Sequence, residues 1–411
     1  MASSSPFEIR EHTFQGQHIR EYPGALANQE DAVWLHAKSY TPREVASGEV
    51  KGQLTIVGLH ANGFHKEIYE PFLEYLYNFL KTKHGLVVGS IWFADQFNQG
   101  QSAVINDGVL GNDAHWWDHS RDILQMINTF RSQMRRPIVA VGHSMGGTQA
   151  VAASFYHPRI FEALVLMDPP MTMKYAPTLP QMLQFNMKKP EKFRSHEEAS
   201  EFVQKSPFFK GWNKAVVQRY IKTAFHDGPT VLNPEPETVK LKTHPHAEAR
   251  TLRYTHPDVH KDSPLTGPLY MPHTRQAYSF LGSLRPPVQF VLGKGSQICP
   301  KDEIEHRTKF RGTLPGGSGG IEAGNVESVI VKGGHFLPMT NPEGAAETVA
   351  KFLARRIEAW RKAEAAFMEK WSSQSIAEKQ RLQPEEEKAY TAPFKPWNNP
   401  FALPDGGRSK L

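Results

Sequence analysis

The sequence predicts an α/β fold in which a mainly parallel sheet is covered by helices on both faces. Short apolar runs alternate along the chain with longer stretches whose apolar residues recur at helical spacing. The short runs are mostly apolar, as expected of parallel strands that are buried on both faces. The 411 residues are enough for one large α/β domain of roughly 250–300 residues with insertions.

The expected elements follow this alternation from the N-terminus onward. Two early segments, 7–14 and 33–40, would start the sheet with antiparallel strands. The parallel strands are expected at 54–59, 86–92, 137–141, 163–167, 288–292 and 326–331. The helices are expected at about 66–83, at about 115–134, from about 146 and from about 343 onward.

A long insert interrupts this pattern between about 171 and 285, where no strands are expected. One helix would begin with a capping box made by Ser195 and Glu198, and another would cover about 213–226. Because the insert falls between two core strands, we expect a helical lid and not an independent domain. The expected organisation is a first core part (1–170), the lid (171–285), a second core part (286–370) and a Pro-rich flexible tail (371–411).

The net charge, the cysteine count and the terminal residues limit which partners and which cellular compartments are expected for this protein. The formal charge is +6 and the excess is spread along the chain, which favours a solvated basic surface over a nucleic-acid site. One cysteine excludes an intrachain disulfide and favours a reducing compartment. We expect no secretory leader and no membrane span. The final residues Ser409, Lys410 and Leu411 match a peroxisomal address, so we expect an import receptor as partner and the peroxisome matrix as location.

The strongest chemical motif is Gly142-His143-Ser144-Met145-Gly146. It matches G-x-S-x-G and stands between a buried strand and a helix. This pattern is typical of the nucleophile elbow of the α/β-hydrolase fold, in which a sharp turn lifts the serine hydroxyl above the sheet. The sequence therefore predicts Ser144 as a nucleophile.

A general base and an oxyanion hole are expected at two further strand ends. His335 follows two glycines directly after the last core strand, where a hydrolase of this fold has its catalytic histidine. The backbone N–H of Met145 would provide one half of the oxyanion hole. The loop from His60 to Phe64 would provide the other half, for which we favour the N–H of Asn62.

The acid of the expected triad departs from the common pattern. The carboxylate usually follows the strand at 288–292, but Ser296 occupies that position. Asp168, at the end of the strand after the nucleophile helix, is the favoured replacement. Asp302 remains the alternative. Either carboxylate would hold the histidine tautomer and stabilise the imidazolium.

No cofactor or metal is expected, and the substrate is expected to be apolar. The histidines at 244, 246, 256 and 260 have irregular spacing and no accompanying cysteine, which argues against a zinc site. The lid is rich in aromatic and aliphatic residues. We expect Phe185 and Phe209 from the lid, together with Phe64, to line a pocket for a bulky acyl group.

Four features together resemble a fungal group of peroxisomal α/β-hydrolases. They are the elbow, the segment from His60 to Tyr69, the placement of Asp168 and the C-terminal Ser-Lys-Leu, and the resemblance covers about residues 20–360. The group includes a yeast peroxisomal lipase, hydrolases of host-selective toxin biosynthesis and the type I acyl-CoA thioesterase of mycophenolic acid biosynthesis. The resemblance implies a triad of Ser144, Asp168 and His335.

The expected activity is hydrolysis of an acyl thioester or ester, with a CoA thioester favoured as substrate. The resemblance implies a place in fungal secondary metabolism or toxin biosynthesis. A lipase or carboxylesterase is the nearest alternative. An epoxide hydrolase is disfavoured because such enzymes on this fold usually carry Asp at the elbow, where this chain has Ser144. A hydrolase fold without catalysis, used for binding, is the alternative from another class, suggested by Ser296 at the usual acid position.

Overall fold

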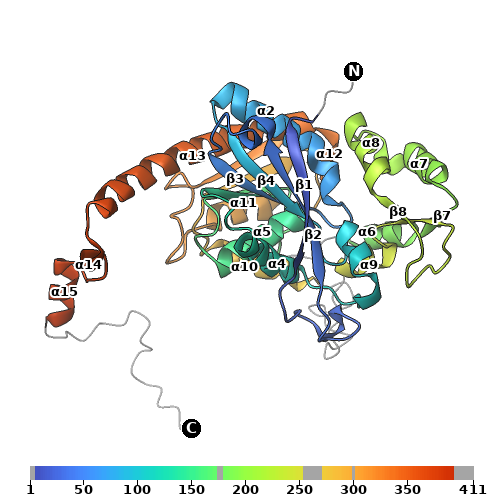
Figure 1. Ribbon diagram of the computed structural model, residues 1–411, viewed down its shortest axis with the longest axis horizontal. Helices are drawn as coiled ribbons and strands as arrows, with labels where there is room; N and C mark the ends of the chain where they lie inside the picture. The colour runs from blue at the N-terminus through green and yellow to red at the C-terminus, as the bar shows by residue number, and fades with distance from the viewer. Residues whose placement is uncertain (1–4, 174–178, 253–270, 299–300, 393–411) are drawn as a thin grey trace, which may run out of the picture. The chain divides into compact units, whose positions relative to one another are not determined.

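The structure of the protein is a computed structural model that describes residues 5–173, 179–252, 271–298 and 301–392. Its centre is an eight-stranded sheet in the order β1-β2-β4-β3-β5-β6-β10-β11 (Figure 1). β2 is antiparallel to β1 and β4, and the other neighbouring strands are parallel. The strands are β1 Phe7–Gln15, β2 Trp34–Pro42, β3 Leu54–Leu59, β4 Val88–Ala94, β5 Ile138–His143, β6 Ala163–Met167, β10 Val288–Gly293 and β11 Val326–Val331. The predicted fold class is confirmed.

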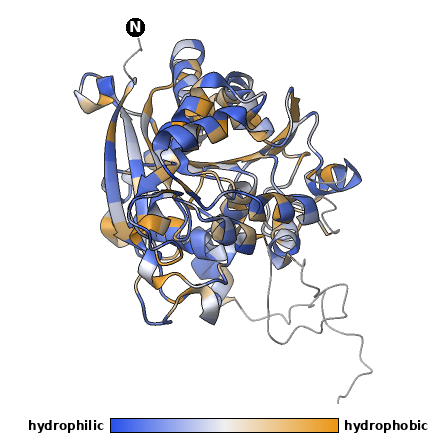
Figure 2. Cartoon of the chain, turned by 90° about the vertical axis from the view of Figure 1, so that its right-hand side faces the viewer, coloured by the Kyte–Doolittle hydropathy of each residue, from blue (hydrophilic) through white to orange (hydrophobic). Residues whose placement is uncertain are grey.

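Helices cover both faces of the sheet. α2 and the first part of α13 pack with one buried apolar cluster, and α4, α5 and α10 pack with the other. Figure 2 shows hydrophobic and hydrophilic residues side by side on helices of the molecule. α5 differs, because its residues from Met145 to Ser154 are all buried. The helices outside the insert are α1 Arg43–Ala46, α2 Glu70–His84, α3 Gly100–Ile105, α4 Trp116–Thr129, α5 Met145–Tyr156, α10 Pro272–Leu281, α11 Lys301–Phe310, α12 Leu337–Thr340 and α13 Pro342–Ser372.

The order of the strands determines where a ligand can bind beside the sheet. After β3 the chain passes to β4 on one side, and it then returns to β5 on the other side of β3. In such sheets, ligands bind beyond the carboxyl ends of the strands, near the point where the order reverses. The loops after β3, β5, β6 and β11 all leave the sheet at this edge.

The insert between β6 and β10 differs from the expected all-helical lid. It contains helices where two were predicted, but also an antiparallel sheet in the order β7-β9-β8, which the sequence analysis missed. These strands have only two or three residues, too short for their side-chain alternation to stand out. The described elements are α6 Leu179–Met187, β7 Lys192–Phe193, α7 His196–Lys205, α8 Lys214–Thr223, β8 Phe225–Asp227, β9 Val239–Leu241 and α9 Pro245–Thr251.

The C-terminal residues Ala359–Leu411 form a second unit. It holds the last part of α13 and two short helices, α14 Ile376–Lys379 and α15 Pro384–Thr391, neither of which contains a buried residue. These helices lie in the segment predicted as a flexible tail. Ser409, Lys410 and Leu411 lie outside the described residues. No described helix combines the length and apolar character needed to cross a lipid bilayer.

Candidate active site

Ser144 occupies the sharp turn between β5 and α5. Its φ is 54° and its ψ is −122°, a conformation that L-residues rarely adopt. The turn needs small neighbours, because a Cβ at Gly142 would lie 2.5 Å from the Gly146 carbonyl oxygen, and one at Gly146 would lie 2.2 Å from that of Leu59. The two glycines therefore let the chain reverse tightly while the serine hydroxyl points away from the sheet.

Three predicted residues meet through hydrogen bonds above this turn. The Ser144 hydroxyl lies 2.9 Å from Nε2 of His335, and Nδ1 of His335 lies 2.6 Å from Oδ2 of Asp168. All three side chains come from different strand ends. In this arrangement His335 can accept the serine proton at Nε2 while Asp168 holds the proton on Nδ1. Their catalytic roles remain a prediction.

The structure brings Asp168, and not Asp302, to the histidine. The Asp168 N–H donates to the carbonyl of Val291 at 2.9 Å, which ties the end of β6 to β10. Asp302 lies in the first turn of α11. Ser296 occupies the position where the acid usually stands. Its hydroxyl donates a hydrogen bond to Oδ2 of Asp168 and so stabilises the carboxylate that takes the place of the usual acid.

The environment of Asp168 keeps this carboxylate charged. The side chain is buried, and burial alone would raise its pKa. The hydrogen bond and charge of His335, together with the Ser296 hydroxyl, outweigh burial and hold the pKa of Asp168 below its usual value. An ionised Asp168 is the form that can stabilise an imidazolium at His335.

A second hydrogen-bond chain, missed by the sequence analysis, links the loop after β3 to His335. The Ala61 N–H donates to the Tyr69 hydroxyl at 2.9 Å, and that hydroxyl lies 2.9 Å from Nδ1 of His143. Nε2 of His143 lies 2.8 Å from the His335 carbonyl oxygen, which can only accept, so Nε2 carries the proton. Burial, followed by the nearby His335, lowers the pKa of His143 to about 3, so its ring is neutral.

The loop after β3 leaves one backbone donor available beside Ser144. The N–H of Gly63 donates to Oε1 of Gln99 at 2.7 Å, and that of Phe64 donates to the Ala61 carbonyl. The Asn62 N–H has no acceptor among the described residues, and neither has the N–H of Met145 at the start of α5. These are the two groups predicted for the oxyanion hole, and that role remains a prediction.

The Asn62 side chain is itself held on both sides. Its Nδ2 donates to the Glu248 carbonyl at 2.9 Å, and its Oδ1 accepts from Nε2 of Gln99 at 2.8 Å. Gln99 therefore fixes the loop through its contacts with two consecutive residues. Nothing in the sequence near Gln99 pointed to this contact, because 36 positions separate it from Gly63.

A cavity of about 300 Å³ opens above Ser144 and His335. Phe64 and Phe185 line it as predicted, but Phe209 does not. Phe209 instead packs inside the insert against Trp212 and Tyr220, with ring centroids 4.9 and 4.8 Å away, and its neighbour Phe208 faces the cavity. The other apolar lining residues include Trp116, Met182, Leu252, Met271, Ile298 and Phe336.

Comparison with known proteins agrees with this geometry. The model of the family described as "Alpha/beta hydrolase family" matches residues 56–348. The chain is 32% identical to the type I acyl-CoA thioesterase mpaH of Penicillium brevicompactum, over 89% of this chain and 92% of that protein. It is 28% identical to the peroxisomal membrane protein LPX1 of Saccharomyces cerevisiae, over 41% of this chain and 48% of that protein.

A solved structure extends the likeness to the fold. The peroxisomal alpha-beta-hydrolase Lpx1 of Saccharomyces cerevisiae superimposes with a TM-score of 0.69 and 20% identity, covering 92% of this chain and 100% of that one. The predicted resemblance to fungal hydrolases is confirmed by these relatives. The chain belongs to the alpha/beta hydrolase family.

Proposed function

We propose that this protein is a serine hydrolase that cleaves acyl thioesters of CoA, with Ser144 as nucleophile, His335 as base and Asp168 as supporting acid. The observation that carries the proposal is the hydrogen-bonded series Ser144–His335–Asp168 beneath an apolar cavity. The thioester is favoured because a relative with 32% identity over 89% of the chain bears the name acyl-CoA thioesterase.

The first half of the reaction forms an acyl-enzyme. His335 Nε2 takes the Ser144 proton as Oγ attacks the thioester carbonyl. The negative charge that develops on the carbonyl oxygen is stabilised by the N–H groups of Asn62 and Met145. The C–S bond then breaks, the acyl group stays on Oγ, and the CoA thiolate takes the proton from His335.

The second half releases the acid. Water loses a proton to His335 Nε2 and attacks the acyl carbonyl, and the same two N–H groups stabilise the second oxyanion. The bond to Oγ breaks and Ser144 regains its proton from His335. The products are a carboxylic acid and the free enzyme, and no cofactor takes part in these steps.

We also propose the peroxisome matrix as the location, with an import receptor as partner. Two observations support this. Ser409, Lys410 and Leu411 match a peroxisomal address, and one similar yeast protein, Lpx1, bears a peroxisomal name in both the sequence and the structure comparison. CoA thioesters are abundant acyl donors in that compartment, which fits the proposed substrate.

Ester hydrolysis, as in a lipase or carboxylesterase, is the second candidate. The cavity beside Ser144 favours an apolar acyl group whatever the leaving group is. Distinguishing the two needs matched substrates: the same acyl group as its CoA thioester, its p-nitrophenyl ester and its triacylglycerol. We expect kcat/KM to be highest for the CoA thioester, measured through release of free thiol. Higher kcat/KM for both oxygen esters would contradict the thioesterase assignment and favour the esterase.

A further inference from the structure

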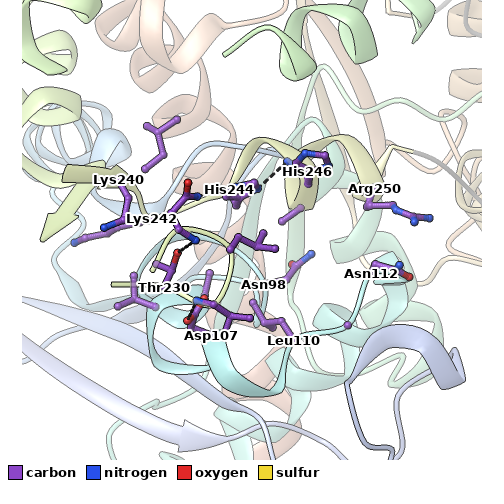
Figure 3. A pocket seen from close by; sticks show the side chains of 18 of the residues that line it. Asn98, Asp107, Leu110, Asn112, Thr230, Lys240, Lys242, His244, His246 and Arg250 are labelled. Carbon is purple, nitrogen blue, oxygen red and sulfur yellow. Dashed lines mark hydrogen bonds between the residues drawn. The ribbon is translucent and has the colours of Figure 1, made fainter. Parts of the chain in front are cut away.

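A second cavity, of about 620 Å³, lies beside α9, on a different face of this helix from the active-site cavity (Figure 3). His246, Ala247 and Arg250 of this helix line the second cavity, whereas Glu248 and the following Leu252 line the active-site cavity. These positions belong to different faces of a helix. α9 therefore separates two cavities, and the triad accounts for only one of them.

Two cations line the second cavity without a direct ion pair among the described residues, although the more distant carboxylates of Glu67 and Asp95 act on Lys242 through space. Lys242 and Arg250 are half-buried, and neither side chain has an ion pair or hydrogen bond within the described part of the chain. Burial lowers the pKa of Lys242, which reflects the cost of holding its charge there. Lys240 differs, because its ammonium donates to the carbonyls of Gly228, Glu235 and Thr238. Lys242 and Arg250 lie on different sides of the cavity (Figure 3), so a ligand with more than one anionic group could give each of them a direct partner.

The acidic groups of the cavity are already engaged. Asp107 accepts the Val231 N–H at 2.7 Å, and Glu191 lies 3.5 Å from the imidazoles of both His244 and His246. The remaining lining combines apolar surface, hydrogen-bonding groups and stacked imidazoles 5.2 Å apart. These residues include Leu26, Val104, Leu110, Leu241, Asn98 and Thr230. Phosphate beside the cations and a flat, partly polar ring system beside the rest would suit this surface.

The turn after β4 connects the two cavities. Asn98 lines the second cavity and donates to the Thr251 hydroxyl at 3.3 Å, at the end of α9. The next residue, Gln99, holds Asn62 and Gly63 of the active-site loop. One helix, about 10–12 Å across with its side chains, and one turn thus lie between the two cavities.

We propose that the second cavity binds the phosphorylated nucleotide end of a CoA thioester whose acyl group occupies the cavity above Ser144. This inference rests on the proposed thioesterase function. CoA has the matching shape, because a long flexible pantetheine arm separates its thioester from its phosphorylated adenosine. Lys242 and Arg250 pair with its phosphates, while the apolar side chains and imidazoles contact the adenosine.

The test compares two thioesters of one acyl group in the full chain. One carries CoA and the other carries N-acetylcysteamine, which lacks the nucleotide. We expect Lys242→Met and Arg250→Met each to raise KM for the CoA thioester about tenfold, the usual cost of losing one charge-assisted hydrogen bond. KM for the N-acetylcysteamine thioester and kcat for both substrates should stay unchanged. Lys210→Met, which removes an exposed charge that lines neither cavity, is the matched control.

Inhibition by a free nucleotide tests whether the second cavity binds the nucleotide end of CoA or a free nucleotide. Adenosine 3′,5′-bisphosphate should inhibit CoA thioester hydrolysis competitively, and both variants should weaken this inhibition about tenfold. Binding of that nucleotide without any change of KM for the CoA thioester would overturn the inference, since the cavity would then take a free nucleotide. An unchanged KM in both variants with no nucleotide binding would overturn it as well.

Failure of the proposed function has a different signature. A wild-type chain that releases thiol from neither thioester would contradict thioester hydrolysis itself. Calorimetric binding of adenosine 3′,5′-bisphosphate, weakened by Lys242→Met and not by Lys210→Met, would still support a nucleotide site in this cavity. Absence of both activity and nucleotide binding would overturn both proposals.

Discussion

The position of the triad acid depends on a few atoms around Asp168. Its Oδ2 accepts from both His335 and Ser296. We predict that Asp168→Asn lowers kcat by roughly 10⁴, because the amide no longer holds the correct histidine tautomer. Asp302→Asn, which removes a carboxylate in the first turn of α11, is the control and should change kcat little. Steady-state thiol release measures both. The opposite ranking of the two variants would move the acid to Asp302.

Ser144 and His335, which the structure brings within hydrogen-bonding distance, could be singled out from the sequence because each stands in a local motif. Ser144 directly follows a buried strand within Gly142-x-Ser-x-Gly146, and His335 follows Gly333 and Gly334 shortly after the last strand of the sheet. The sequence left two candidates for the acid, Asp168 and Asp302, and only the structure shows that Asp168 lies against His335. Gln99, Tyr69 and His143 escaped prediction, because their contacts join loops far apart in the chain and no local pattern marks them.

One buried amide points to selectivity within the acyl cavity. Asn186 is 4% exposed, lines this cavity, and has no side-chain hydrogen-bond partner among the described residues. An amide that faces the cavity without a protein partner can donate to or accept from a ligand there, so we predict that it binds an oxygen of the acyl group. Asn186→Leu should shift kcat/KM by roughly 10–100-fold towards a plain alkyl acyl group over one that carries a hydroxyl.

The control for Asn186 lies on the same helix. Gln184 of α6 is exposed and does not line the cavity, so Gln184→Leu should leave the ratio of kcat/KM values for the two acyl groups unchanged. An unchanged ratio in Asn186→Leu would mean that this amide faces water in the cavity and selects nothing.

Among the elements of the insert, two adjacent residues have different surroundings, one in the wall of the active-site cavity and the other in the packing of the insert itself. Phe208 lines the active-site cavity, whereas Phe209 is 9% exposed and packs against Trp212 and Tyr220. We predict that Phe208→Ala changes the relative kcat/KM of short and long acyl chains by about 10–200-fold. Phe209→Ala should leave that ratio unchanged but lower the free energy of unfolding by about 3–5 kcal/mol. A chain-length series and thermal denaturation of both variants provide the measurements.

The insert is also where prediction from sequence failed most. Aromatic residues of the insert line the cavity above Ser144, but the short turn Pro207–Phe209 decides which of two adjacent rings faces inward. The strands β7, β8 and β9 were missed because a charged residue occupies each of them, including the buried Lys240. The central strands β3, β5, β6 and β10 could be predicted because they are buried along their whole length and so read as mostly apolar runs.

At the scale of the whole molecule, the last residues are expected to act as an address and not as part of the fold. Deleting Ser409, Lys410 and Leu411 should leave kcat and Tm unchanged while a tagged protein moves from peroxisomes to cytosol. Fluorescence microscopy in cells without the full-length chain measures the location. Continued import of the shortened protein under that condition would place the address elsewhere in the sequence.

In the proposed reaction, Ser144 forms the acyl-enzyme from which a CoA thioester is hydrolysed. The most direct measurement is the rate of CoA release by the wild type and by Ser144→Ala, at saturating acyl-CoA and with equal folding verified by thermal denaturation. We predict that the substitution lowers kcat by about 10⁴–10⁶, since the elbow nucleophile has no substitute. CoA release by Ser144→Ala within tenfold of the wild-type rate would show that Ser144 is not the nucleophile of CoA thioester hydrolysis.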